Sequence, residues 1–183
     1  MTNHQWLSPD PRLAERIMVA LDVPNWPRAE QLLEQLKGYG CYMKVGMQLY
    51  YAEGPHVVHR LKEAGYKVFL DLKLHDIPNT VKEAAASLTR LGVDMFNVHA
   101  AGGVRMMEAA LEGMERECRA GQARPQVIAV TQLTSTDQTV LNDEIGIPGT
   151  VEQTVLHYAR LAQQAGLNGV VASPREVSAI KTA

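Results

Sequence analysis

Short apolar runs alternate along this chain with longer stretches of helical period, and this alternation restricts the folds that it can adopt. The runs are rich in β-branched and apolar residues, which is typical of buried strands. They lie at residues 17–21, 42–45, 68–72, 95–98, 127–130 and 169–172. Because strands that alternate with helices form parallel sheets, the pattern predicts an α/β fold of six βα units.

Proline and glycine mark the ends of the predicted helices. Pro27 opens a segment with leucines on one face, and Gly38 follows it, which is the usual placement of proline and glycine around a helix. The sequence Ser173-Pro174-Arg175-Glu176 matches a capping box and predicts the start of a last helix. The same reasoning predicts the intervening helices over residues 55–64, 78–91, 103–119 and 151–165.

Composition and motifs exclude several classes of protein. A net charge of −2 lacks the excess of cations that binding to nucleic acid requires. The longest apolar runs have about five residues, whereas a membrane span needs about 20. The N-terminus, with Pro9, Asp10 and Glu15, does not resemble a signal peptide. We therefore expect a single domain over residues 1–183, located in the cytoplasm, with no nucleic-acid or membrane partner.

Polar side chains follow the predicted strands at their carboxyl ends. They are Asp22, Lys44, Asp71 with Lys73, His99, Thr131 with Thr134, and Ser173. Catalytic residues of parallel α/β proteins gather at this edge of the sheet. Because side chains alternate along a strand, we expect Asp71 and Lys73 to face the same way.

Two readings of Asp71 and Lys73 are open, a structural ion pair and part of a catalytic site. Buried ion pairs are poor stabilisers, because desolvation of each charge costs several kcal/mol. Lys44 and Asp76 bring two further charges to the same region, and stability alone does not explain four. The cluster therefore favours the functional reading. The sequence has no metal-binding histidine pair, dinucleotide fingerprint or Walker loop, so neither a dinucleotide nor ATP is indicated as a ligand.

One segment identifies a resemblance to a known family. Residues 71–80, Asp-Leu-Lys-Leu-His-Asp-Ile-Pro-Asn-Thr, resemble the signature of the orotidine 5′-phosphate decarboxylase family. Supporting matches occur, in order, at the other strands: Ala20-Leu21-Asp22, Lys44-Val45-Gly46, Asn97-Val98-His99, Val130-Thr131-Gln132-Leu133-Thr134-Ser135 and Ala172-Ser173-Pro174. The resemblance covers essentially the whole chain, in its bacterial form.

The resemblance implies a TIM (β/α)8 barrel that acts as a homodimer with shared active sites. Such enzymes convert orotidine 5′-monophosphate to UMP and CO2 in de novo pyrimidine biosynthesis, without metal or organic cofactor. Lys44, Asp71 and Lys73, with the partner subunit's Asp76, would form a catalytic network of alternating charge. Asp71 would lie against the substrate carboxylate, and Lys73 would stabilise the carbanion at C6 and protonate it.

The resemblance also assigns substrate contacts to Asp22, Lys44, Ile77, Thr80, His99 and Thr134. Asp22 and Lys44 would hold the ribose hydroxyls, with help from the partner subunit's Thr80. The partner subunit's Ile77 would border the pocket, and Thr134 would form a hydrogen bond to the base. His99 would line the pocket wall or orient the substrate.

The chain departs from the family in its length. A complete TIM barrel has eight βα units and roughly 250 residues, whereas this sequence supplies six units, so we expect a partial barrel without the last two. In the family, the loops after strands seven and eight carry the Gln and Arg that grip the 5′-phosphate. Each charge-assisted hydrogen bond that is missing costs about 1.5–3 kcal/mol, so we expect this chain alone to bind substrate poorly.

Two alternatives stay open. A Mg²⁺-dependent relative, hexulose-phosphate synthase or keto-gulonate-phosphate decarboxylase, places a similar Asp-x-Lys-x-x-Asp at strand three. Those proteins lack the continuation found at residues 77–80, and a chelator separates the two classes. The other alternative is a catalytically inactive barrel fragment that keeps the subunit interface.

Overall fold

The computed structural model describes residues 11–119, 121 and 123–183, and it contains all six predicted strands. They are β1 Met18–Ala20, β2 Tyr42–Gly46, β3 Lys67–Leu74, β4 Met95–His99, β5 Gln126–Val130 and β6 Gly169–Val171. The chain divides into two compact units, the first ending at Asp71 and the second beginning at Leu72, so the boundary falls within β3. The single domain over 1–183 stays a prediction.

The first unit pairs β1, β2 and β3 in parallel, in chain order. Its helices are α1 Pro11–Ala14, α2 Trp26–Leu36, α3 Met47–Glu53 and α4 His56–Glu63. The sequence predicted one helix between β2 and β3, but the structure has two. Gly54 ends α3 with a φ of 67°, a conformation that glycine adopts without the steric cost of a side chain, and α4 begins two residues later.

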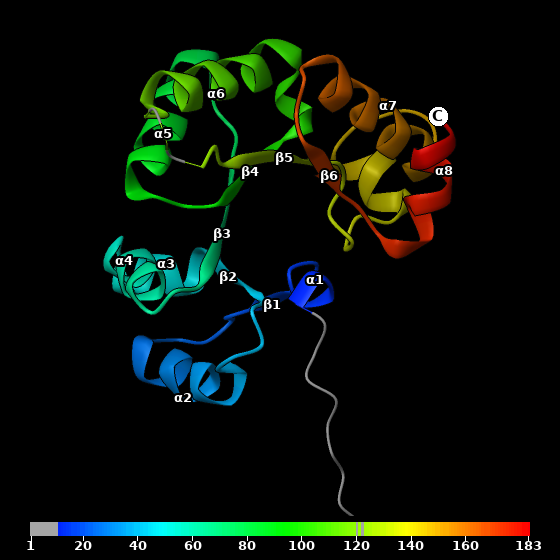
Figure 1. Ribbon diagram of the computed structural model, residues 1–183. Coiled ribbons are helices and arrows are strands. Elements are labelled where there is room, and N and C mark those ends of the chain that lie inside the picture. The colour runs from blue at the N-terminus through cyan, green and yellow to red at the C-terminus, as the bar shows by residue number, and fades with distance from the viewer. Residues whose placement is uncertain (1–10, 120, 122) are drawn as a thin grey trace, which may run out of the picture. The chain divides into compact units, whose positions relative to one another are not determined.

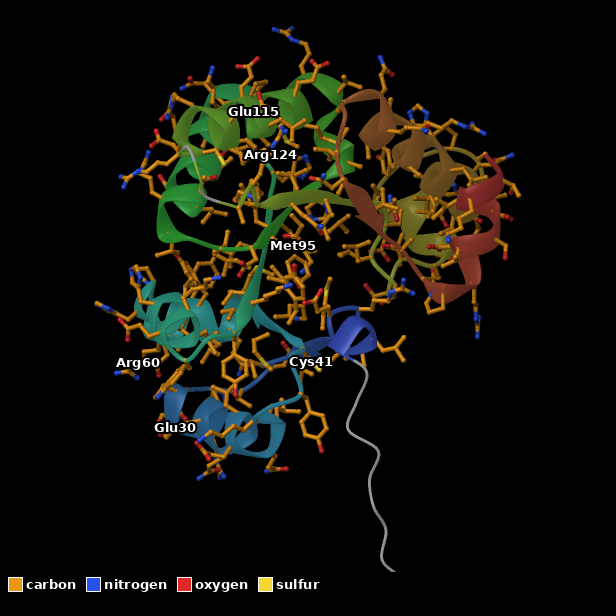
Figure 2. All side chains as sticks on the ribbon, in the orientation of Figure 1. Glu30, Cys41, Arg60, Met95, Glu115 and Arg124 are labelled. Atoms are coloured by element: carbon orange, nitrogen blue, oxygen red, sulfur yellow. The ribbon has the colours of Figure 1, made fainter. Side chains whose placement is uncertain are left out.

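A cation–π contact joins α2 to α4 in this unit. The Arg60 guanidinium lies 5.0 Å from the centre of the Trp26 ring, and Figure 2 labels Arg60 on its helix. Asn25 caps α2, because its side-chain oxygen accepts a hydrogen bond from the N–H of Arg28 at 3.2 Å. Beneath the helices, the strands bury Met43, Val45 and other apolar side chains completely. This burial fixes the position of β2, which carries Lys44 between these two residues.

The second unit pairs β4, β5 and β6 in parallel, again in chain order. Its helices are α5 Pro78–Leu91, α6 Val104–Glu117, α7 Val151–Gln164 and α8 Val177–Thr182, with short turns η1 Ala100–Gly102, η2 Val140–Glu144 and η3 Pro174–Glu176. The predicted capping box is confirmed at Ser173 and Glu176, although the turn that it opens is 3₁₀ before α8 begins. The α/β class predicted from the sequence is confirmed in both units.

Helices α5 and α6 lie side by side in this unit, as Figure 1 shows in green. Small residues face this contact, and a Cβ placed on Gly113 would lie 2.0 Å from the Lys82 carbonyl oxygen. No side chain fits at that distance. Glycine at position 113 therefore sets how closely the two helices approach.

Ion pairs border the same pair of helices. Arg116 donates two hydrogen bonds of 2.8 Å to the Glu83 carboxylate, and Arg90 pairs with Glu117 at 2.9 Å. The hydrogen bonds from Arg116 lower the pKa of Glu83, and those from Arg90 and Arg116 lower the pKa of Glu117. Glu115 on α6 pairs with Arg124 before β5, and Figure 2 labels both residues.

No helix among residues 11–119, 121 and 123–183 is long and apolar enough to cross a membrane. The N-terminal segment that predicted a cytoplasmic location, residues 1–10, lies outside the described residues.

Candidate active site

Three charged side chains meet at the carboxyl ends of the strands in the first unit. The Lys44 Nζ lies 3.3 Å from Asp22 Oδ1 and 3.4 Å from Asp71 Oδ2. The Asp71 side chain is 13% exposed and that of Lys44 is 22% exposed, whereas Asp22 is 67% exposed. One half-buried ammonium group thus bridges a buried carboxylate and a solvent-facing one.

The strand register explains why these residues meet. Lys44 lies opposite Ala20 of β1, and its carbonyl oxygen accepts the N–H of Leu21 at 2.9 Å, which places Asp22 next along the chain. On the other side, Asp71 lies opposite Gly46 of β2. Because side chains two residues apart share one face of a strand, the Lys44 side chain lies on the same face of β2 as Gly46.

Gly46 leaves room beside these charges. A Cβ at this position would lie 3.4 Å from Asp22 Oδ1 and 3.7 Å from Lys44 Nζ, so any larger side chain would cover both atoms. The sequence matched Gly46 to the family motif but assigned it no role. In the structure, the missing side chain leaves space beside Lys44 and Asp22.

The second unit contains the other predicted catalytic lysine, in an unusual backbone conformation. Lys73 has a φ of 53°, and it is the one non-glycine residue with positive φ in the described part of the chain. This left-handed conformation costs a non-glycine residue roughly 1–2 kcal/mol. The expected alternation, which placed Asp71 and Lys73 on one face, assumed a regular strand. The φ of Lys73 departs from that of a regular strand, and the shared face of Asp71 and Lys73 stays a prediction.

A buried amide contacts this backbone. The Asn97 side-chain oxygen on β4 accepts the backbone N–H of Lys73 at 2.8 Å, and Asn97 is only 2% exposed. Two residues further along β4, the His99 ring contacts that of His75, with 5.3 Å between ring centres. Gly102 lies close to the same pair, since a Cβ there would be 3.3 Å from His75 Cδ2. The end of β4 therefore supports both the backbone of Lys73 and the ring of His75.

The segment after β3 faces solvent. Every residue from 75 to 80 is exposed, and the apolar side chain of Ile77 is 67% exposed. Asp76 accepts the N–H of Ile77 at 2.7 Å through its Oδ1. Thr80 lies in the first turn of α5. The three residues that the family resemblance assigns to the partner subunit's site are thus all exposed in the single chain.

The structure distinguishes the two threonines at the end of β5. Thr131 is buried, and its Oγ1 donates a 3.0 Å hydrogen bond to the carbonyl oxygen of Val171 on β6. Thr134 is exposed three residues later, in the loop that follows. Thr131 therefore joins two strands, whereas Thr134 is exposed and its hydrogen bond to the base stays a prediction.

Comparisons with known proteins match this chain to one family. A family model described as "Orotidine 5'-phosphate decarboxylase / HUMPS family" matches residues 15–183. The chain belongs to this family. An orotidine 5′-phosphate decarboxylase of Geobacillus thermodenitrificans is 56% identical over 90% of this chain and 69% of the relative. One of Bacillus mycoides is 53% identical over 92% of this chain and 71% of the relative.

Solved structures of the decarboxylase family agree in fold. Orotidine 5′-phosphate decarboxylase from Lactobacillus acidophilus has a TM-score of 0.86 and 39% identity, covering 91% of this chain and 75% of that chain. An uncharacterised conserved protein from Geobacillus kaustophilus has a TM-score of 0.88 and 54% identity, covering 91% and 77%. The chain therefore has the fold of the TIM-barrel family that the sequence predicted, and its curated relatives are longer than it is.

Proposed function

We propose that this chain decarboxylates orotidine 5′-monophosphate to UMP and CO2 without a metal or organic cofactor. The observation that carries the proposal is the contact of Lys44 with Asp22 and Asp71 at the strand ends. It occurs in a chain 53–56% identical to named orotidine 5′-phosphate decarboxylases. The family model covers orotidine 5′-phosphate decarboxylases and the HUMPS group together. The identities to named decarboxylases favour the first of these two groups.

Asp71 supplies the charge that acts on the substrate carboxylate in this proposal. Its side chain is 13% exposed, so little water screens its charge. A second carboxylate placed beside it is destabilised, and this repulsion disappears when CO2 leaves. Lys44 forms an ion pair with Asp71 at 3.4 Å and so holds that carboxylate in place. The repulsion thus lowers the barrier to loss of CO2 from the bound substrate.

Lys73 completes the reaction. The bond between C6 and the carboxylate breaks, and its electron pair stays on C6. The Lys73 ammonium group stabilises that negative charge and then donates a proton to C6, which leaves a neutral amine. We propose that Asp71 and Lys73 act on one substrate because they stand two residues apart on β3.

The remaining assigned residues bind the substrate. The exposed carboxylate of Asp22 accepts a hydrogen bond from a ribose hydroxyl, and Lys44 donates one, while Gly46 leaves the space. Thr134 forms a hydrogen bond to the pyrimidine, which its exposed position permits. His99, half-buried against His75, forms part of the pocket wall.

We further propose a cytoplasmic homodimer in which each subunit completes the other's site. The partner subunit's Asp76 would extend the charge network, and the partner subunit's Ile77 and Thr80 would border the pocket. The exposure of Ile77 supports this proposal, since an apolar side chain in a solvent-facing loop is typical of an interface.

The test follows the loss of orotidine 5′-monophosphate absorbance, with the Geobacillus thermodenitrificans enzyme as positive control. Substrate concentration is raised until the rate saturates, since we expect the 183-residue chain to bind substrate poorly. Lys73→Ala should lower kcat by orders of magnitude and leave UMP binding, followed by NMR, largely intact. Equal losses of turnover and binding would instead indicate a structural ion pair. An inactive unchanged chain beside an active control would refute the proposal.

A chelator arm separates this proposal from Mg²⁺-dependent chemistry. In the part of the chain that the structure describes, no group of three or more His, Cys, Asp or Glu side chains could hold a metal ion. Turnover should therefore be the same with and without EDTA. Activity that EDTA abolishes and Mg²⁺ restores would favour a hexulose-phosphate synthase or keto-gulonate-phosphate decarboxylase.

A further inference from the structure

We propose that Asn97 is a positioning residue for the proton transfer, because it holds the backbone of Lys73 in its left-handed conformation. The inference rests on the proposed function. It concerns a contact between two strands, and Asn97 itself is not assigned to touch the substrate.

The first step of the argument is the strain at Lys73. Among the described residues, every other positive φ belongs to a glycine, so this chain avoids the conformation wherever a side chain is present. A strained backbone persists only where surrounding structure determines it. The exception falls on the residue that carries the proton.

The second step is the contact that determines the strain. Asn97 Oδ1 lies 2.8 Å from the Lys73 backbone nitrogen and accepts its N–H. Asn97 is 2% exposed and stands between Phe96 and Val98, both completely buried. Water has little access to replace the amide there. Loss of Asn97 would leave the Lys73 N–H without this acceptor, and the backbone would relax toward an extended conformation.

The third step links the backbone to the side chain. The direction of a Cα–Cβ bond follows φ and ψ, so relaxation at Lys73 redirects its ammonium group. Proton transfer to a carbon requires the donor at close range and in line, whereas ligand binding depends on other residues. Asn97 should therefore affect kcat more than KM.

The chain offers a matched control in the same unit. Asn168, an exposed residue just before β6, accepts the backbone N–H of Val127 on β5 at 2.8 Å through its Oδ1, which is a hydrogen bond of the same type and length. Val127 has no positive φ and is not assigned to the site. Asn168→Leu thus removes an amide-to-backbone hydrogen bond of the same length, at a more exposed position, without touching Lys73.

The experiment compares Asn97→Leu, Asn97→Asp and Asn168→Leu with the unchanged chain. Asn97→Leu should lower kcat by about 100-fold, the typical effect of a misplacement of about 1 Å, while KM changes by less than about threefold. Asn97→Asp keeps an acceptor oxygen and should recover part of kcat. Asn168→Leu should keep kcat, even if it lowers the melting temperature as much.

A second readout reports the backbone directly. In a left-handed residue the amide and α protons lie closer together than in an extended one, so the NMR cross-peak between them is stronger. It should be strong for Lys73 in the unchanged chain and in Asn168→Leu, and weak in Asn97→Leu.

The outcomes separate the two proposals. An active chain in which Asn97→Leu retains kcat, or retains the strong cross-peak at Lys73, refutes the positioning role alone. An inactive unchanged chain, beside an active Geobacillus thermodenitrificans enzyme, refutes the proposed function and the positioning role with it.

Discussion

Replacement of Gly113 by alanine should destabilise the second unit, although alanine is the better helix former. The added Cβ would lie 2.0 Å from the carbonyl oxygen of Lys82, whereas ordinary contact begins at 3.4 Å. It would also lie 2.8 Å from the Lys82 carbonyl carbon. These are backbone atoms, which no change of rotamer can remove. Helices α5 and α6 must therefore move apart by about 1.4 Å at this point.

The magnitude follows from the packing that this movement disrupts. Both helices bury alanines, and Ala85, Ala86 and Ala110 are completely buried. A gap of about 0.5–1 Å already removes a quarter to a half of the dispersion energy between atoms. Overpacking costs about 1–3 kcal/mol, and a backbone clash belongs at the upper end. Since alanine contributes about 1 kcal/mol more than glycine to a helix, the net loss should be about 2 kcal/mol.

Thermal unfolding followed by circular dichroism measures this loss, which corresponds to a melting temperature lower by about 4–8 °C. Exposed Glu108 on the same helix provides the control. Glu108→Ala should be more stable than Glu108→Gly by about 1 kcal/mol, since the two variants differ only in helix propensity at this position. The same exchange should thus have opposite signs at the two positions. A Gly113→Ala variant as stable as the unchanged chain would refute the reasoning.

Two further predictions concern the ion pairs and the subunit interface. Arg116 lowers the pKa of Glu83 below its ordinary value of 4.5. The stability that this ion pair contributes is therefore fully present above pH 4.5 and is lost as the pH falls through the lowered pKa. The difference in melting temperature between the unchanged chain and Arg116→Leu should therefore shrink below pH 4.5. At neutral pH, added salt should also reduce this difference. A difference that stays constant with pH and salt would contradict the prediction. Mixing Asp76→Asn with Lys73→Ala subunits should restore activity in an absorbance assay, because a shared site then receives both native residues from different chains; no recovery would exclude shared sites.

Strands and helices were predictable from the sequence because their signals are local. The β-branched runs identified all six strands, and Pro78 with Gly92 gave the bounds of α5. Helix α3 was missed, since it follows β2 at Gly46 without a loop to mark its start. The cluster of Asp22, Lys44 and Asp71 was also predictable, because parallel strands bring their carboxyl ends to one edge.

Features that depend on distant contacts were not predictable. The left-handed conformation of Lys73 is held by a residue 24 positions away, and no local pattern marks it. The close approach at Gly113 depends likewise on a carbonyl of another helix. The family resemblance assigned a role to Thr134 alone, and only the hydrogen bond to Val171 assigned Thr131 to the sheet.

The most direct test of the central claim is the identity of the product formed in D2O. Orotidine 5′-monophosphate is incubated with the 183-residue chain, and the pyrimidine is examined by proton NMR. The account predicts UMP that carries deuterium at C6, because the Lys73 ammonium group exchanges with solvent before it donates to the carbanion. Lys73→Ala should form almost none. Recovery of unreacted substrate from the unchanged chain, under conditions where the Geobacillus thermodenitrificans enzyme produces deuterated UMP, would contradict the account.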